Sequence, residues 1–170
     1  MKRLFICLGL ILLTQSGCSS PTMKQKIMKA NSTHLIVNEH INTLWYFHLI
    51  LEDSLKDQRE HTLGMIDMYK LRNPLEYPAH YQESSSLTKT DTQRLIGLYK
   101  NLDKYLSQLK DRLSEDQPLN ETEKESIKRM LGPVDEVQNM DIKNDLEYQQ
   151  VDGLNDLIED SLGDLDIKKG

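Results

Sequence analysis

Residues 44–51 read LWYFHLIL and are apolar at every position except His48. They belong to a longer segment, residues 32–72, in which apolar residues recur at alternating steps of four and three, the spacing of one helix face. A helix that is apolar around much of its circumference is surrounded by other elements. We therefore predict a helix over 32–72 whose middle lies at the centre of the core, with His48 as a hydrogen-bonded core histidine. The predicted buried face consists of Val37, Ile41, Leu44, His48, Leu51 and Leu55.

Further helical periodicity follows in three places. Thr90, with a glutamine three residues later, has the spacing of a capping box and precedes a stripe of leucines and tyrosines that runs to residue 113. Asn120 repeats the capping-box spacing before a helix that Gly132-Pro133 should end. From residue 134 the pattern returns more weakly and predicts one broken helix or two shorter ones.

Composition points to the same fold class. Trp45 is the only tryptophan and Phe47 the only phenylalanine after residue 18, while Leu, Lys, Glu, Asp and Gln dominate. The length suits one domain. We predict an all-α fold, an up-and-down bundle of three or four helices, with residues 32–170 as a single helical domain. Long stripes of this kind also suit a self-associating coiled coil.

One long loop is expected between the helices, at about 73–89. Asn73 and Tyr77 each precede a proline, which disfavours helix at both positions. The run Ser84-Ser85-Ser86 adds polar, irregular chain. Loops of this length within a domain tend to be functional. This one carries Tyr77, His80 and Tyr81, which are candidate contacts for a partner protein or, alternatively, a cover for the open end of the bundle.

The first eighteen residues have the pattern of an export signal. Lys2 and Arg3 precede an apolar run from Leu4 to Leu13, which is about half the length that a transmembrane helix needs. The run leads to Ser16-Gly17-Cys18, which resembles the lipobox of bacterial lipoproteins. The resemblance covers residues 1–18 only. It implies cleavage after residue 17 and a diacylglycerol on the thiol of Cys18; alternatives are an ordinary signal peptidase site or an uncleaved anchor.

This resemblance sets the expected location and domain organisation. Residues 1–17 would be the lipoprotein signal peptide, residues 18–31 the lipidated cysteine and a tether, and the body would hang from a membrane of the cell envelope on its extracytoplasmic side. Lys24, Lys26 and Lys29 in the tether would lie within reach of anionic headgroups. The alternative is that they are solvated side chains on an arm.

Charge is unevenly distributed along the chain. Residues 134–170 hold eleven Asp or Glu and three Lys, a net charge of −8, whereas residues 1–133 carry a net charge of +2. An acidic half repels phosphate backbones, so we exclude nucleic acid as a partner. The acidic half suits either a basic protein partner or a solvated face.

The sequence contains no catalytic motif: no Gly-rich phosphate loop, no Gly-x-Ser-x-Gly and no His-Glu-x-x-His. One candidate metal site is His61, Met65 and Met68, which are spaced four and three residues apart on one helix face. Imidazole and thioether ligands suit copper. Methionine is also an ordinary filler of cores, so the same three residues fit a packing role.

These patterns together favour a membrane-anchored lipoprotein that binds a protein partner and is neither an enzyme nor dependent on a cofactor. An accessory, exclusion, immunity or adaptor module would have these features. The alternative is a helical bundle in the envelope that buffers metal through His61, Met65 and Met68 or senses a solute.

Overall fold

The computed structural model describes residues 22–115, 118–140 and 148–165. Every regular element in these ranges is a helix, which confirms the predicted all-α bundle. There are six helices in the described ranges, more than the three or four expected, because the first predicted helix is divided in two and the predicted loop contains a short helix. They are α2 (Met23–Leu55), α3 (Arg59–Arg72), α4 (Glu76–Tyr81), α5 (Lys89–Ser114), α6 (Glu121–Asn139) and α7 (Tyr148–Leu162).

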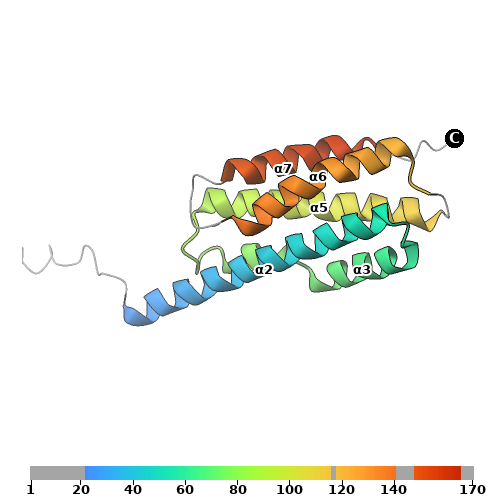
Figure 1. Ribbon diagram of the computed structural model, residues 1–170. Coiled ribbons are helices and arrows are strands. Elements are labelled where there is room, and N and C mark those ends of the chain that lie inside the picture. Colours follow the sequence, from blue (N-terminus) through green and yellow to red (C-terminus); the bar gives the residue numbers. More distant parts are fainter. Residues whose placement is uncertain (1–21, 116–117, 141–147, 166–170) are drawn as a thin grey trace, which may run out of the picture.

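The five longer helices lie side by side and surround one core. α2 packs against α6 and α3, α7 packs against α6 and α5, and α3 also contacts α5. Along the chain these helices alternate in direction, as an up-and-down bundle requires (Figure 1). The short helix α4 contacts α2 and α5.

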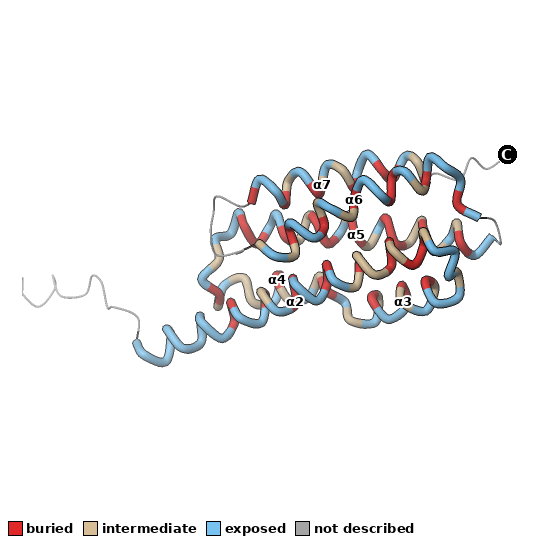
Figure 2. The backbone as a smooth tube through the Cα atoms, viewed as in Figure 1, coloured by how far each residue is buried: buried red, intermediate tan, exposed pale blue. Residues whose placement is uncertain are grey.

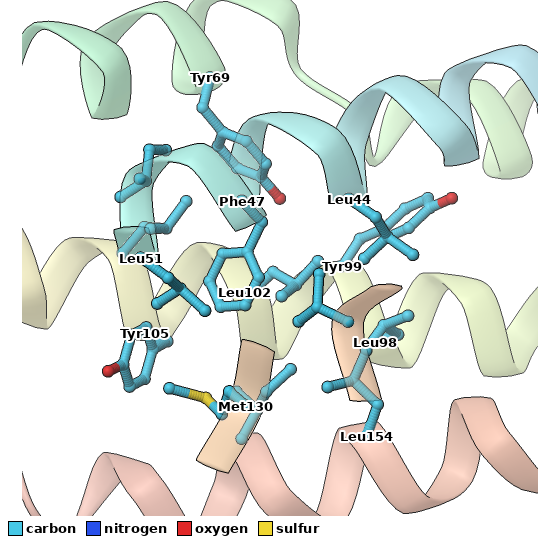
Figure 3. Close-up of a cluster of buried hydrophobic side chains, with 14 of the residues drawn as sticks. Leu44, Phe47, Leu51, Tyr69, Leu98, Tyr99, Leu102, Tyr105, Met130 and Leu154 are labelled. Atoms are coloured by element: carbon cyan, nitrogen blue, oxygen red, sulfur yellow. The ribbon is translucent and has the colours of Figure 1, made fainter. Parts of the chain in front are cut away.

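The core is built from aliphatic and aromatic side chains of all five longer helices. The stripe predicted for α5 is confirmed, because each of its members is buried: Leu95, Leu98, Tyr99, Leu102, Tyr105, Leu106, Leu109 and Leu113. Phe47 from α2 meets Tyr105 edge to face, with ring centroids 5.9 Å apart. Figure 3 shows how these side chains converge with Met130 of α6 and Leu154 of α7. Burying each such side chain stabilises the fold by about 1.5–3 kcal/mol.

The buried face of α2 differs from the predicted one by about one residue. Ile41 is 40% exposed, and His48 lies at the edge of the core, not inside it. The fully buried positions include Ile36, His40 and Phe47. The prediction missed this face because it includes polar residues, which an apolar pattern does not count. Its buried polar members are Ser32, Thr33, Glu39, His40, Thr43, Asp53 and Ser54.

The predicted helix over 32–72 is a hairpin of two helices. α2 ends at Leu55, and Asp57 then takes a left-handed conformation with a φ of 55°. The amide groups of Lys56 and Gln58 both donate to the carbonyl oxygen of Asp53, which closes the turn. α3 therefore runs back along α2, and residues 59–72 are placed where they can contact α5.

The predicted stop at Gly132-Pro133 is wrong. α6 continues through Pro133 to Asn139, although proline cannot donate the helical hydrogen bond at that position. Val134 and Val137 are fully buried on the far side of Pro133, and their packing favours continuation of the helix. α7 runs through Gly153 without a break.

α2 begins at Met23, within the segment predicted to be a tether. Thr22 caps it in a capping box with Gln25: the Gln25 backbone amide donates to Thr22 Oγ1 (3.3 Å), and the Thr22 backbone amide donates to Gln25 Oε1 (2.8 Å). Residues 22–31 are all exposed, and this part of α2 projects beyond the other helices (Figure 2). The predicted signal peptide and Cys18 lie outside the described residues. Within those residues, no helix combines the length and the apolar character that crossing a membrane requires.

Candidate functional site

The strongest candidate site is the surface of α4, which holds the three residues predicted as partner contacts. Asn73, with a φ of 49°, ends α3 in a left-handed conformation, and the chain then turns into α4. Pro78 is the buried residue of this short helix. The segment predicted as an irregular loop is therefore an ordered surface element.

Hydrogen bonds tie the chain after α4 to the side of α2. Ser84 Oγ donates to Ser32 Oγ (2.9 Å), and the Ser86 amide donates to Thr33 Oγ1 (2.8 Å). Thr33 Oγ1 also lies 2.8 Å from Ser86 Oγ. The α4 surface thus lies near the point where the exposed first turns of α2 leave the bundle.

Tyr77, His80 and Tyr81 are brought together on α4. The His80 and Tyr81 rings meet edge to face with centroids 4.8 Å apart, and the Tyr77 and Tyr81 centroids are 6.3 Å apart. Tyr81 packs partly against the core, whereas His80 is exposed. Tyr81 therefore fits the covering role, and His80 with Tyr77 presents polar and aromatic groups to the outside.

An open hollow of about 730 Å³ lies over this helix. Its wall includes Arg72 at the end of α3, which the sequence did not identify. Arg72 binds Glu39 of α2 through Nη2, at 2.9 Å and 3.2 Å from the two carboxylate oxygens, and its guanidinium lies 5.1 Å from the centre of the Tyr46 ring. These contacts fix the position of Arg72. The lining residues are Arg72, Glu76, Tyr77, Ala79, His80 and Tyr81.

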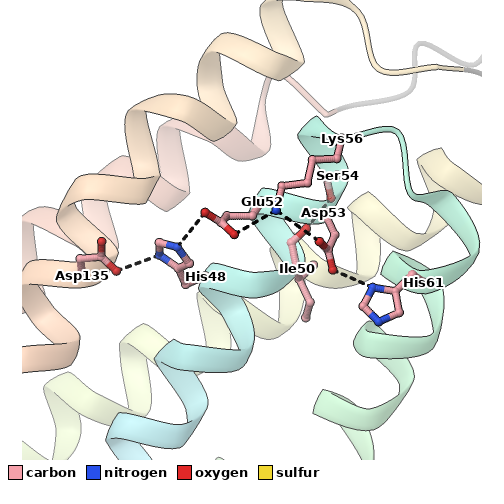
Figure 4. Close-up of polar contacts among 8 residues, drawn as sticks. All are labelled: His48, Ile50, Glu52, Asp53, Ser54, Lys56, His61 and Asp135. Carbon is pink, nitrogen blue, oxygen red and sulfur yellow. Dashed lines mark hydrogen bonds and ion pairs between the residues drawn. The ribbon is translucent and has the colours of Figure 1, made fainter.

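The candidate metal residues lie on α3, away from α4. His61 is exposed and its Nδ1 lies 2.7 Å from Asp53 Oδ2 (Figure 4). Met65 packs partly against the core, and Met68 is 51% exposed. The part of the chain that the structure describes contains no cluster of three or more His, Cys, Asp or Glu side chains able to hold a metal. In the structure the side chain of His61 contacts a carboxylate, that of Asp53. The copper site stays a prediction.

His48 forms part of a polar cluster on the bundle surface. Its Nδ1 lies 2.8 Å from Asp135 Oδ1 of α6, and its Nε2 lies 3.5 Å from Glu52 Oε1 (Figure 4). Lys56 donates to the other oxygen of Glu52 at 3.2 Å, and this hydrogen bond lowers the pKa of that carboxyl group. The cluster links α2 to α6 and is accessible to solvent, so it resembles an ordinary surface ion network.

The hydrogen-bonded core histidine is His40. Its Nε2 lies 2.9 Å from the carbonyl oxygen of Val137, and its Nδ1 lies 3.0 Å from Tyr99 Oη. A carbonyl oxygen can only accept, so Nε2 carries the proton and, in the neutral ring, the Tyr99 hydroxyl donates to Nδ1. Burial lowers the pKa of His40 to about 4. This group joins α2, α5 and α6 inside the core.

Among these features, only the α4 surface combines an accessible hollow with fixed aromatic and guanidinium groups. Such groups suit noncovalent contact with another molecule. Compared with protein-family models, with curated proteins and with solved structures, the chain matches none.

Proposed function

We propose that this chain is a lipid-anchored protein of the bacterial cell envelope that binds a protein partner through the α4 surface and catalyses no reaction. The observation that carries the proposal is the open hollow over α4, which Tyr77 and His80 line together with Arg72, and Arg72 is held in place by Glu39. Aromatic residues and arginine are enriched among the residues that dominate binding energy at protein interfaces.

The position of the hollow supports a partner bound close to a membrane. The chain after α4 is bonded to Ser32 and Thr33, the first buried residues of α2. Cys18 precedes this point by fourteen residues in the sequence. A lipid on Cys18 would therefore hold the α4 surface near the bilayer, which raises the effective concentration of a membrane-bound partner.

Site-specific cross-linking in living cells tests the proposal. A photoreactive residue at Tyr77 or at His80 should give the same single dominant adduct, and the same group at Gln149, an exposed position on α7, should not. The adduct should disappear when Cys18→Ala releases the protein from the membrane. Equal labelling from Gln149, or no adduct from either α4 position, would contradict the proposed binding surface.

A substitution pair separates binding from folding. Tyr77→Ala with His80→Ala should abolish the adduct formed from a photoreactive group at Ala79, while the circular dichroism of the purified protein stays unchanged because His80 is exposed and Tyr77 is partly exposed. Glu83→Ala, an exposed change in the same segment, is the matched control and should leave the adduct intact.

A further inference from the structure

The exposed apolar side chains are confined to one part of the bundle. In the described ranges, all eight large apolar residues with high exposure lie on α2 and α3, and none lies on α5, α6 or α7. Scattered exposed apolar residues are normal, but their concentration on neighbouring helices marks a contact surface. Those on α2 are Met23, Ile27, Met28, Leu35, Ile41 and Trp45.

Four of these residues belong to a single stripe along α2. The stripe, here named the outer stripe, follows steps of three and four residues, so its members share one side of the helix. They point away from the core, to which Ile36, His40 and Phe47 face. From residue 23 to residue 45 the stripe is about 33 Å long at 1.5 Å per residue. Its members are Met23, Ile27, Ala30, His34, Asn38, Ile41 and Trp45, all of them exposed. Two of them are polar, His34 and Asn38, and their side-chain nitrogens lie 3.1 Å apart in the middle of the stripe.

The charges beside the first turns of the outer stripe are positive, whereas Glu52 lies on the same side of the helix seven residues after Trp45. Lys24 and Lys26 flank it on either side of the helix, whereas Lys29 lies on the side that carries the buried Thr33 and Ile36. No acidic residue occurs before Glu39, and Glu39 is buried and bound to Arg72. An apolar stripe bordered by lysines has the composition of helices that lie in the interface of anionic membranes. The indole ring of Trp45 suits the same environment, because it has an apolar body and a polar N–H.

Helix α7 has the opposite charge. α7 contains four acidic residues and no Lys or Arg between Tyr148 and Leu162. It packs on α5 and α6, on the side of the bundle away from α2 (Figure 1). Contact through the outer stripe would therefore bring lysines to the headgroups and keep the acidic helix away from them.

We propose that the outer stripe of α2 lies flat on an anionic phospholipid bilayer, so that the bundle rests on its side. The apolar run Leu4–Leu13 and Cys18 both precede Met23, so a chain attached to the membrane by either of them enters the structure at one end of the stripe. The inference builds on the proposed membrane attachment and adds the orientation of the body. A bundle that only hangs from its anchor would leave Trp45 in water.

Trp45 is the only tryptophan of the chain, so its fluorescence reports on the outer stripe without labelling. The full chain, purified from membranes, is incorporated into vesicles of phosphatidylcholine with phosphatidylglycerol and isolated by flotation. Trp45 emission should shift to shorter wavelength, and brominated lipids should quench it more than aqueous iodide does. Vesicles of phosphatidylcholine alone should give a weaker shift. Floated protein whose Trp45 is quenched by iodide and not by brominated lipid would overturn the orientation while leaving the attachment intact; protein that does not float would overturn both.

Charge variants provide the matched comparison. Lys24→Gln and Lys26→Gln should each reduce the ratio of lipid-contacting to water-exposed Trp45 about fivefold. Lys100→Gln and Lys104→Gln, exposed changes on α5, should not alter it. If all four variants behave alike, the lysines beside the stripe do not direct the contact and the proposal fails.

A second copy of the chain is the main competitor for the same surface. In that case Trp45 emission would shift in detergent solution without vesicles, and the shift would grow with protein concentration. That result would overturn the bilayer proposal. Ile27→Gln and Ile41→Gln keep the fold, because both side chains are exposed, and both should weaken the lipid contact.

Discussion

Two fully buried tyrosines of α5 differ in the hydrogen bonding of their hydroxyl groups. Tyr99 is bonded to His40, whereas the Tyr105 hydroxyl has no hydrogen-bond partner in the described part of the chain. Tyr99→Phe should lower the free energy of unfolding by about 1–3 kcal/mol, because it leaves the Nδ1 of His40 buried and unpaired. Tyr105→Phe keeps the ring contact with Phe47 and removes only the unpaired group, so it should leave that free energy unchanged or slightly higher. Urea unfolding of both variants measures the difference, and equal losses would contradict the assignment.

His40 gives the fold a predictable dependence on pH. Because burial lowers its pKa from 6.5 to about 4, the unfolded chain binds a proton at a pH where the folded chain does not. The stabilising contribution is therefore complete above pH 6.5 and declines as the pH falls from 6.5 towards 4, by about 3 kcal/mol in total.

Comparison with His40→Gln isolates this contribution from the other titrating groups. The variant is expected to be less stable near neutral pH, but its free energy of unfolding should fall less steeply between pH 6.5 and pH 4 than that of the native chain. Parallel pH curves for the two proteins, measured by urea unfolding, would show that His40 is not the responsible group.

Single residues were predictable where local pattern alone decides their role. The leucines and tyrosines of α5 repeat at helical spacing, and all of them are buried as predicted. Tyr77, His80 and Tyr81 stand out as aromatic groups among prolines and serines, and their role as partner contacts stays a prediction. Arg72 was not predictable, since its role depends on Glu39, a residue 33 positions earlier. His40 was missed because a buried polar residue looks the same in sequence as an exposed one.

At the level of elements, the start of α5 provides a direct test of capping. The sequence favoured Thr90 as the cap, but Thr88 caps the helix: the Asp91 amide donates to Thr88 Oγ1 (3.1 Å), and the Thr88 amide donates to Asp91 Oδ2 (3.3 Å). Thr88→Ala should lower the free energy of unfolding by about 1 kcal/mol, because it removes an acceptor at the helix start. Thr90→Ala, an exposed position inside the first turn, is the control and should change it by less than about 0.5 kcal/mol. The reverse ranking in thermal or urea unfolding would restore the cap predicted from sequence.

The predicted helix boundaries were wrong where local sequence signals compete with packing. Two threonines two residues apart offer equivalent caps, and the choice between them depends on how the chain leaves α4. The turn at Asp57 has no glycine or proline to mark it, so the hairpin of α2 and α3 reads as one helix. Gly132-Pro133 gives the opposite error: a strong stop signal is overridden by the burial of Val134 and Val137.

For the whole molecule, periodicity predicted the class of fold but not the arrangement of the helices. An apolar stripe shows that a helix has a buried side, and several such stripes in one chain predict a bundle. They do not show which helix each stripe meets, so the place of α3 beside both α2 and α5 was not predictable. The outer stripe of α2 was not predictable for a related reason: α2 is apolar on several sides, so the sequence does not show which apolar residues are buried and which are exposed.

The division of α2 into an exposed projection and a packed part predicts where the chain can be shortened. Residues 22–31 are all exposed, whereas Ser32 and Thr33 are buried and bonded to the segment after α4. A chain that begins at Asn31 should therefore keep the free energy of unfolding of the full chain to within about 0.5 kcal/mol. A chain that begins at His34 should lose about 1–3 kcal/mol, because Ser84 and Ser86 lose their partners on α2. Urea unfolding of the two shortened chains distinguishes them, and equal stabilities would mean that the hydrogen bonds to Ser32 and Thr33 do not hold the α4 surface in place.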